Sequence, residues 1–211
     1  MKQKYFIILL SGIMTTYAKK PINLDVAKAE VEAYITSGKL DREIEKVTNK
    51  AWKKINKIPV KKNSALVFDI DDTLISSHES NKKIGYGNLL VCDPAWAHHA
   101  NFPIIKSMKN FYDKAKQKGF KIFLISNRDA SLYGPTKQNL ETQGYTGYEQ
   151  IIIRKDGTPK VSSRIFKEQE RENLINQGYD IVATIGDQES DILGEHTGIK
   201  IKIPNYLYLV K

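Results

Sequence analysis

The sequence predicts an α/β protein built on a doubly wound parallel sheet, and two patterns support this prediction. Five short apolar runs bounded by polar residues are candidate buried strands, and amphipathic stretches of ten or more residues lie between them. Strands that alternate with helices form right-handed crossovers and hence a parallel sheet. With 211 residues, of which 41% are hydrophobic, the chain is long enough for one compact domain with a sizeable core.

The order of these elements follows from the apolar periodicity and from the residues that interrupt it. The expected strands are residues 65–68, 121–125, 151–153, 181–185 and 199–203. Helices are expected near residues 23–36, 41–57, 104–118, 131–143 and 163–177. Ser37-Gly38 separates the first two helices, and Asp41 is the expected N-cap of the second. Gly119 and Gly178 end two later helices, because glycine readily adopts the left-handed conformation at a helix C-terminus.

The first residues have the features of an export signal. Lys2 and Lys4 form a basic start, an apolar stretch runs from there to Tyr17, and Thr16 and Ala18 are small residues suited to a cleavage site. The apolar stretch is shorter than the roughly 20 residues that span a bilayer. We therefore expect residues 1–18 to be a cleaved signal, the mature protein to be periplasmic or secreted, and no stable membrane insertion after processing.

Composition excludes several classes of protein. The single cysteine, Cys92, excludes an intramolecular disulfide framework and a cysteine-based zinc cluster. The mean hydropathy of −0.43 excludes a protein with many membrane spans. The net charge is +9, and the densest lysine run, over residues 53–62, has no interleaved stacking aromatics, so no specific nucleic-acid partner is expected.

Polar residues follow three of the expected strands directly, at the edge where parallel α/β sheets bind ligands. These segments are Asp69-Ile70-Asp71-Asp72-Thr73, Ser126-Asn127-Arg128 and Gly186-Asp187-Gln188-Glu189-Ser190-Asp191. Carboxylates gathered at one edge repel one another and lose solvation, so they require a cation among them. A set of oxygen ligands suits Mg²⁺, and the sequence therefore predicts a magnesium site.

Four motifs in these segments resemble those of the haloacid dehalogenase-like (HAD) phosphohydrolase superfamily. They are FDIDDTL from Phe68, ISNR from Ile125, a lysine before the next crossover and GDQESD from Gly186. SNRDASL, the GY before the fourth strand and KIPN near the end further resemble subfamily IIIB, the class B-type acid phosphatases that include plant vegetative storage proteins. The resemblance implies a Rossmann-like HAD core over residues 63–211, an N-terminal helical region over 19–62 and a small cap insert near 74–103.

The resemblance also implies a Mg²⁺-dependent acid phosphatase that hydrolyses phosphate monoesters through a phosphoaspartyl intermediate. Asp69 would be the nucleophile, and Asp71 would protonate the leaving alkoxide and then activate water. The expected Mg²⁺ ligands are the side chains of Asp69 and Asp187 and the backbone carbonyl of Asp71. Because a dehalogenase needs no such acid, Asp71 favours phosphate esters as substrates.

The remaining site residues are assigned by the same resemblance. Ser126, Asn127 and a lysine would bind the phosphoryl group; Lys167 opens the helix before the fourth strand and is favoured over Lys160. Supporting roles are expected for Thr73, Arg128 and Asp191. Thr73 would fix its loop, Arg128 would either pair with another site residue or contact substrate, and Asp191 would bind metal through water or orient the lysine.

The insert carries large side chains whose function the sequence leaves open. They are Tyr86, Trp96, His98, His99 and Phe102. An aromatic wall could stack on a nucleoside or aryl leaving group, or it could simply pack the insert onto the core. A 5'-nucleotidase, a phosphotransferase and a catalytically weak storage or binding protein are therefore alternatives. The expected partner is a small-molecule phosphomonoester, and homo-oligomerisation is left open.

Overall fold

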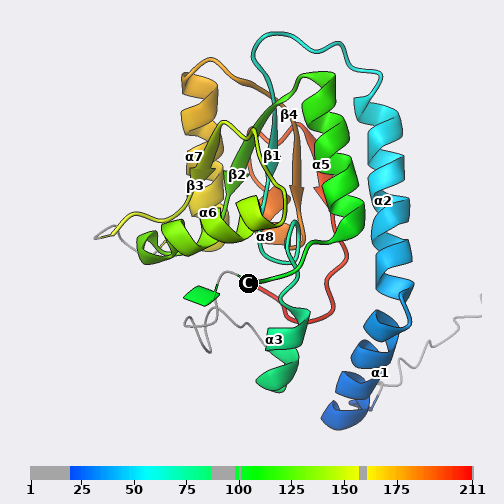
Figure 1. The fold of residues 1–211 in the computed structure, drawn as a ribbon. Helices are drawn as coiled ribbons and strands as arrows, with labels where there is room; N and C mark the ends of the chain where they lie inside the picture. The colour runs from blue at the N-terminus through cyan, green and yellow to red at the C-terminus, as the bar shows by residue number, and fades with distance from the viewer. Residues whose placement is uncertain (1–19, 87–97, 100, 157–160, 211) are drawn as a thin grey trace, which may run out of the picture.

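The computed structural model of this chain describes residues 20–86, 98–99, 101–156 and 161–210, and its centre is a five-stranded parallel sheet (Figure 1). The strands are β1 (Ser64–Phe68), β2 (Lys121–Ile125), β3 (Gln150–Ile152), β4 (Asp180–Gly186) and β5 (Ile199–Lys202). Their order across the sheet is β3-β2-β1-β4-β5. The doubly wound α/β prediction is thereby confirmed, and each strand matches its expected range to within one residue at either end.

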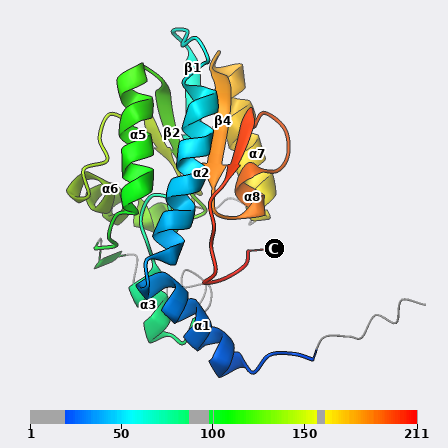
Figure 2. The ribbon, with the colours of Figure 1, turned by 90° about the vertical axis from the view of Figure 1, so that its right-hand side faces the viewer.

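Helices cover both faces of this sheet. On one face lie α2 (Lys39–Ile55) and α5 (Lys106–Lys118), and on the other lies α7 (Ser163–Asn176) (Figure 2). Successive side chains of β1 point to opposite faces, so Leu66 packs with α2 and α5 whereas Val67 packs with α7. Both faces of the central strands are thus buried, as the continuous apolar runs predict.

The shorter elements complete the crossovers. They are α1 (Leu24–Thr36), α3 (His78–Lys83), the 3₁₀ turn η2 (Ala130–Leu132), α6 (Tyr133–Thr142) and α8 (Glu189–Ile192). The helix expected at 131–143 thus begins as a 3₁₀ turn that continues into α6. Helix α5 begins two residues later than the expected start at residue 104.

The expected N-cap of α2 is wrong. The helix begins at Lys39, and its N-cap is Gly38, which has a left-handed φ of 70°. Glycine adopts this φ without steric cost, so the chain turns out of α1 there and enters the helix early. Asp41 instead lies in the first turn of α2, where a carboxylate interacts favourably with the helix dipole.

Helix α1 is joined to the insert by one carboxylate. Glu32 contacts Lys82 Nζ at 2.6 Å and His78 Nε2 at 2.8 Å, and it accepts a hydrogen bond from the Tyr86 hydroxyl. Hydrogen bonds from Lys82 and Tyr86 lower the pKa of Glu32 to about 2. The N-terminal helices are therefore fastened to α3, which begins a few residues after the segment that starts with Asp69.

Two of the insert's aromatic residues pack within the protein. Phe102 is buried in the main hydrophobic cluster, and the Tyr86 hydroxyl is engaged by Glu32. Phe102 therefore packs the insert onto the core, whereas His98 and His99 are exposed. Trp96 and Cys92 lie outside the described residues.

The expected export signal also lies outside the described residues, which begin at Lys20. In the part of the chain that the structure describes, no helix combines the length and the apolar character needed to cross a bilayer.

The packing of α2 on the sheet can be tested at Ile55, which is fully buried in the main cluster. We expect Ile55→Ala to lower the free energy of unfolding by about 2–5 kcal/mol, because the truncated side chain leaves a cavity. Urea denaturation measures this. The adjacent, exposed Lys54 supplies the control Lys54→Ala, which should change stability by less than about 0.5 kcal/mol. Equal effects of the two substitutions would contradict the packing of α2 described here.

Candidate active site

The loop after β1 is tightly turned at the carboxyl edge of the sheet. The amide of Asp69 donates to Ile185 O of β4 at 2.9 Å, and the carbonyl of Ile70 accepts from the amides of Thr73, Leu74 and Ile75. Asp72 has a left-handed φ of 55°, a conformation that aspartate tolerates better than most residues. The loop therefore holds Asp69 at the end of the central strand.

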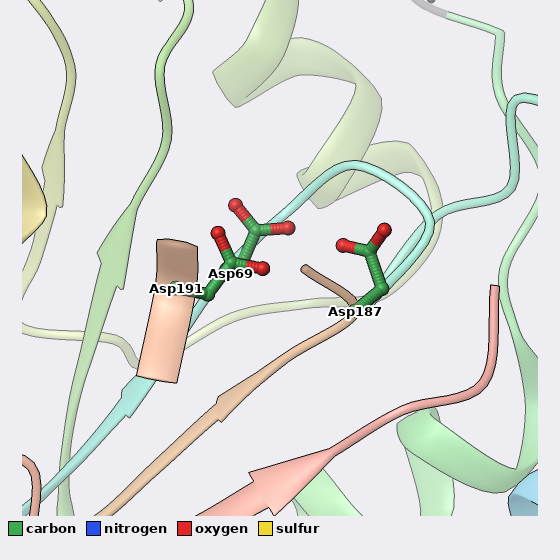
Figure 3. Close-up of side chains that lie close together, drawn as sticks. All are labelled: Asp69, Asp187 and Asp191. Carbon is green, nitrogen blue, oxygen red and sulfur yellow. The ribbon is translucent and has the colours of Figure 1, made fainter. Parts of the chain in front are cut away.

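Three carboxylates meet at this edge, and Figure 3 shows them facing a common space. Asp69 follows β1, Asp187 follows β4 and Asp191 lies on α8. One oxygen from each lies within 4.8 Å of the others, and all three residues are buried. A glycine permits this approach, because a Cβ at Gly186 would lie 2.3 Å from that of Asp191.

Lys167 bridges two of these carboxylates. Helix α7 brings its ammonium group to Asp69 Oδ1 and to Asp191 Oδ1, the latter at 2.7 Å, and the lysine side chain is only 3% exposed. Burial alone would lower the pKa of Lys167, but the two carboxylates outweigh this effect and raise it above its ordinary value. Lys167 therefore remains charged, while Asp69 Oδ2 has no hydrogen-bond partner among the described residues.

Among the described residues, the donors to the side-chain carboxylate of Asp187 are neutral groups. Thr73 Oγ1 donates to its Oδ1 at 3.1 Å, and Gln188 Nε2 and Asn205 Nδ2 each donate to its Oδ2 at 2.6 Å. Burial, followed by the proximity of Asp191, raises the pKa of Asp187 to about 7. Burial likewise raises the pKa of Asp69 well above its usual range, although Lys167 opposes this shift.

The donor set fits a divalent cation. The three carboxylates and the Lys167 ammonium together carry a formal charge of −2, which a dication would cancel. An all-oxygen set of this kind suits Mg²⁺. Asp191 is already engaged at both oxygens, by Lys167 and by the amide of Gln188 at 2.7 Å, an arrangement suited to orienting the lysine.

Arg128 pairs with Asp71. Its Nε and Nη2 donate to the two oxygens of Asp71 at 3.0 and 2.6 Å, and its Nη1 donates to Thr136 Oγ1 at 2.8 Å. The guanidinium also lies 5.6 Å from the centre of the Phe102 ring. Arg128 was expected either to pair with another site residue or to contact substrate, and in the structure it pairs with Asp71.

The other expected phosphate ligands follow β2. Ser126 is buried, and its Oγ lies 3.4 Å from Asp71 Oδ2. Asn127 accepts a hydrogen bond from Arg154 Nη2 at 3.0 Å, which directs its side chain toward the β3 side of the edge. Lys160, the competing lysine, lies outside the described residues.

Sequence reasoning missed several side chains around Asp187. Gln188 and Asn205 hold its carboxylate, the ammonium of Lys202 donates to its backbone carbonyl, and Tyr208 donates to Asp72 Oδ2 at 2.8 Å. The KIPN segment, which contains both Lys202 and Asn205, carries the resemblance to subfamily IIIB, but its sequence alone does not indicate that these two residues contact Asp187. Thr73, expected only to fix its loop, donates directly to Asp187.

Comparison with known proteins extends over most of the chain. The family model of HAD superfamily subfamily IIIB, acid phosphatase, matches residues 16–211. The chain belongs to this family. It is therefore an enzyme of the acid phosphatase type, and the family implies a small-molecule phosphoester substrate.

Plant proteins are among the relatives of this subfamily IIIB chain. The stem 28 kDa glycoprotein of Glycine max is 35% identical over 172 residues, which cover 78% of this chain and 67% of that protein. Vegetative storage protein 1 of Arabidopsis thaliana is 30% identical over 200 residues, covering 90% of this chain and 74% of that protein. The resemblance to plant storage proteins is thus confirmed.

A solved structure supports the fold of the HAD core. The class C acid phosphatase from Bacillus anthracis superimposes with a TM-score of 0.69 over 88% of this chain and 85% of that chain. The two sequences are 24% identical, so this likeness carries the fold alone.

The raised pKa of Asp187 predicts how the metal-free protein responds to pH. Because the neutral form is favoured in the folded state, stability falls as pH rises from about 4 toward about 7. Asp187→Asn removes this penalty, so we expect the metal-free variant to be more stable than the wild type at pH 7, by on the order of 1 kcal/mol. Thermal unfolding in chelator at several pH values measures the difference.

Exposed Asp180, at the start of β4, provides the matched control for this experiment. Asp180→Asn should follow the wild-type pH profile. An Asp187→Asn variant that is less stable than the wild type at pH 7 in chelator would show that the buried carboxylate carries no such penalty.

Proposed function

We propose that this subfamily IIIB protein is an exported, Mg²⁺-dependent acid phosphatase that hydrolyses phosphate monoesters through a phosphoaspartyl intermediate on Asp69. The observation that carries this proposal is the buried pairing of Asp69 with Lys167 beside two further carboxylates. One carboxylate oxygen is held by the lysine, and the other has no hydrogen-bond partner among the described residues. A nucleophile needs that combination of fixed orientation and an accessible lone pair.

In the first step Asp69 Oδ2 attacks phosphorus, the bond to the ester oxygen breaks and Asp71 supplies a proton to the leaving alkoxide. In the second step Asp71 takes a proton from water, the water oxygen attacks the phosphorus of the acyl phosphate, and inorganic phosphate and Asp69 are released. Lys167 and the hydroxyl of Ser126 would bind the non-bridging oxygens. Asp69, Asp187 and the backbone carbonyl of Asp71 would hold Mg²⁺. When bound, the ion would neutralise charge between the nucleophile and the phosphoryl group.

Arg128 holds both oxygens of Asp71, with its Nε and Nη2 atoms 3.0 and 2.6 Å from them. In the first step substrate binding has to open one of these contacts, so that Asp71 can carry a proton to the leaving oxygen. Arg128 accordingly acts on the reaction through the position of Asp71.

Export is proposed from the basic and apolar pattern of residues 1–18, with cleavage after Ala18.

A catalytically weak storage protein is the second candidate, because vegetative storage protein 1 is among the relatives of this chain. The residues of this chain favour the enzyme. Asp69, Asp71 and Lys167 are all present with their side chains at the carboxyl edge of the sheet, whereas a scaffold without turnover has no need to keep a buried charged set that costs solvation energy.

The two aspartates of the first loop can be separated by their dependence on the leaving group. Asp69→Asn should eliminate turnover of every phosphate ester, because the attacking oxygen is lost. Asp71→Asn should slow cleavage of alkyl phosphates by about 10²- to 10⁴-fold, yet still release p-nitrophenol once per site, because p-nitrophenolate leaves without a proton. A rapid-quench time course with both ester types on each variant measures this.

Glu189→Gln is the matched control, since Glu189 is an exposed carboxylate at the start of α8. It should retain the wild-type rates with both esters. Equal rate losses of Asp71→Asn for the two leaving groups, without a burst, would limit Asp71 to a structural role. Turnover by Asp69→Asn at the wild-type rate would refute the proposed nucleophile.

A further inference from the structure

The segment that follows β5 crosses the carboxyl edge of the sheet and contacts the loops that carry the acidic residues. Figures 1 and 2 show it running from β5 past the lower end of the sheet to the C-terminus. Its first residue, Ile203, donates its amide to Gly186 O at 2.8 Å, and Val210 donates its amide to Gln188 Oε1 at 2.9 Å. We call residues 203–210 the C-terminal strap.

Within the strap, Asn205 is fixed at both ends of its amide group. Its Oδ1 accepts the backbone N–H of Leu207 at 2.7 Å, a local turn typical of asparagine. This bond identifies the oxygen end and leaves Nδ2 to donate to Asp187 Oδ2 at 2.6 Å. The turn therefore aims an N–H group at one defined oxygen of Asp187.

Asp187 depends on such donors for its orientation. Thr73 holds the opposite oxygen from the loop after β1, so the carboxylate is clamped between two segments far apart in the sequence. Asp187 is 1% exposed, and water cannot replace a lost donor without entering the site. A carboxylate rotated out of place would bind a cation with poorer geometry, and groups that orient metal ligands commonly set the affinity in this way.

We propose that Asn205 is a positioning residue that holds Asp187 in the orientation needed to bind Mg²⁺. The strap supports this amide, and the hydroxyl of Tyr208 anchors the strap to Asp72. This role rests on the metal-dependent function proposed above. Through Asn205, the KIPN segment would thus support the proposed Mg²⁺ ligand Asp187.

The test is calorimetric titration of MgCl₂ into the full chain without substrate. Asn205→Ser keeps a side-chain oxygen that can accept from Leu207, but it removes the donor to Asp187. We expect this variant to bind Mg²⁺ about 10- to 100-fold more weakly than the wild type. At saturating Mg²⁺ its kcat should return to within a few-fold of the wild-type value, because the reacting groups are unchanged.

Tyr206→Phe is the matched control, because it removes a strap hydrogen bond to Glu43 that does not reach the site. It should bind Mg²⁺ as the wild type does, and unfolding curves in chelator should show that both variants are folded. Affinity of Asn205→Ser within about twofold of the wild type would overturn the role of Asn205, as would equal losses in both variants. A wild-type protein that binds no Mg²⁺ would instead refute the metal dependence itself.

If Asn205→Ser does not fold, Asn205→Ala and Gln188→Ala provide two further tests of the clamp. The Gln188 amide donates to the same oxygen, Asp187 Oδ2. Each substitution should weaken Mg²⁺ binding, and unchanged affinity in whichever of them folds would overturn the proposal.

Discussion

The site depends on the contacts that the ammonium group of Lys167 makes with the carboxylates of Asp69 and Asp191. Three buried carboxylates at one sheet edge cost solvation and repel one another, and the lysine offsets only part of that cost. The remaining two negative charges make the edge receptive to a dication and to the phosphoryl group that a dication would accompany. Without a bound cation, this charge arrangement therefore lowers the local stability of the fold.

The fold supplies this arrangement by delivering each charged group from a different rigid element. The loop that carries Asp69 follows the central strand β1, Asp187 follows the neighbouring β4, and Lys167 comes from α7 on one face of the sheet. Buried Arg171 strengthens the frame, since its guanidinium donates to the carbonyls of Asp191, Leu193 and Glu195. Because these elements pack through the core, the site is assembled before any ligand binds.

Much of this could be predicted from the sequence. Continuous apolar runs predicted the strands because the sheet is buried on both faces, and residues directly after strands must lie at one edge of a parallel sheet. That rule predicted that Asp69, Ser126 and Asp187 lie at one edge, and the position of Lys167 at the start of the helix before the fourth strand singled out the lysine that contacts Asp69.

Sequence patterns do not predict contacts that depend on side-chain direction or on chain segments without periodicity. The strap has no repeating pattern, so its contact between Asn205 and Asp187 appears only once the chain is folded. The pairing of Arg128 with Asp71 depends on rotamers, and the contact of Glu32 with α3 joins residues about fifty positions apart. The start of α2 was misplaced because a glycine with positive φ overrode the side-chain preference for Asp41 as N-cap.

In the proposed mechanism, Asp69 carries the phosphoryl group during turnover. The direct test is to mix wild-type enzyme with p-nitrophenyl phosphate and to quench the reaction in acid within the first turnover. The protein is then digested, and its peptides are analysed by mass spectrometry. We expect one hydroxylamine-sensitive phosphoryl group on the peptide that contains Asp69, and none in Asp69→Asn. A phosphoryl group on another residue, or steady turnover with no phosphorylated enzyme at any quench time, would contradict it.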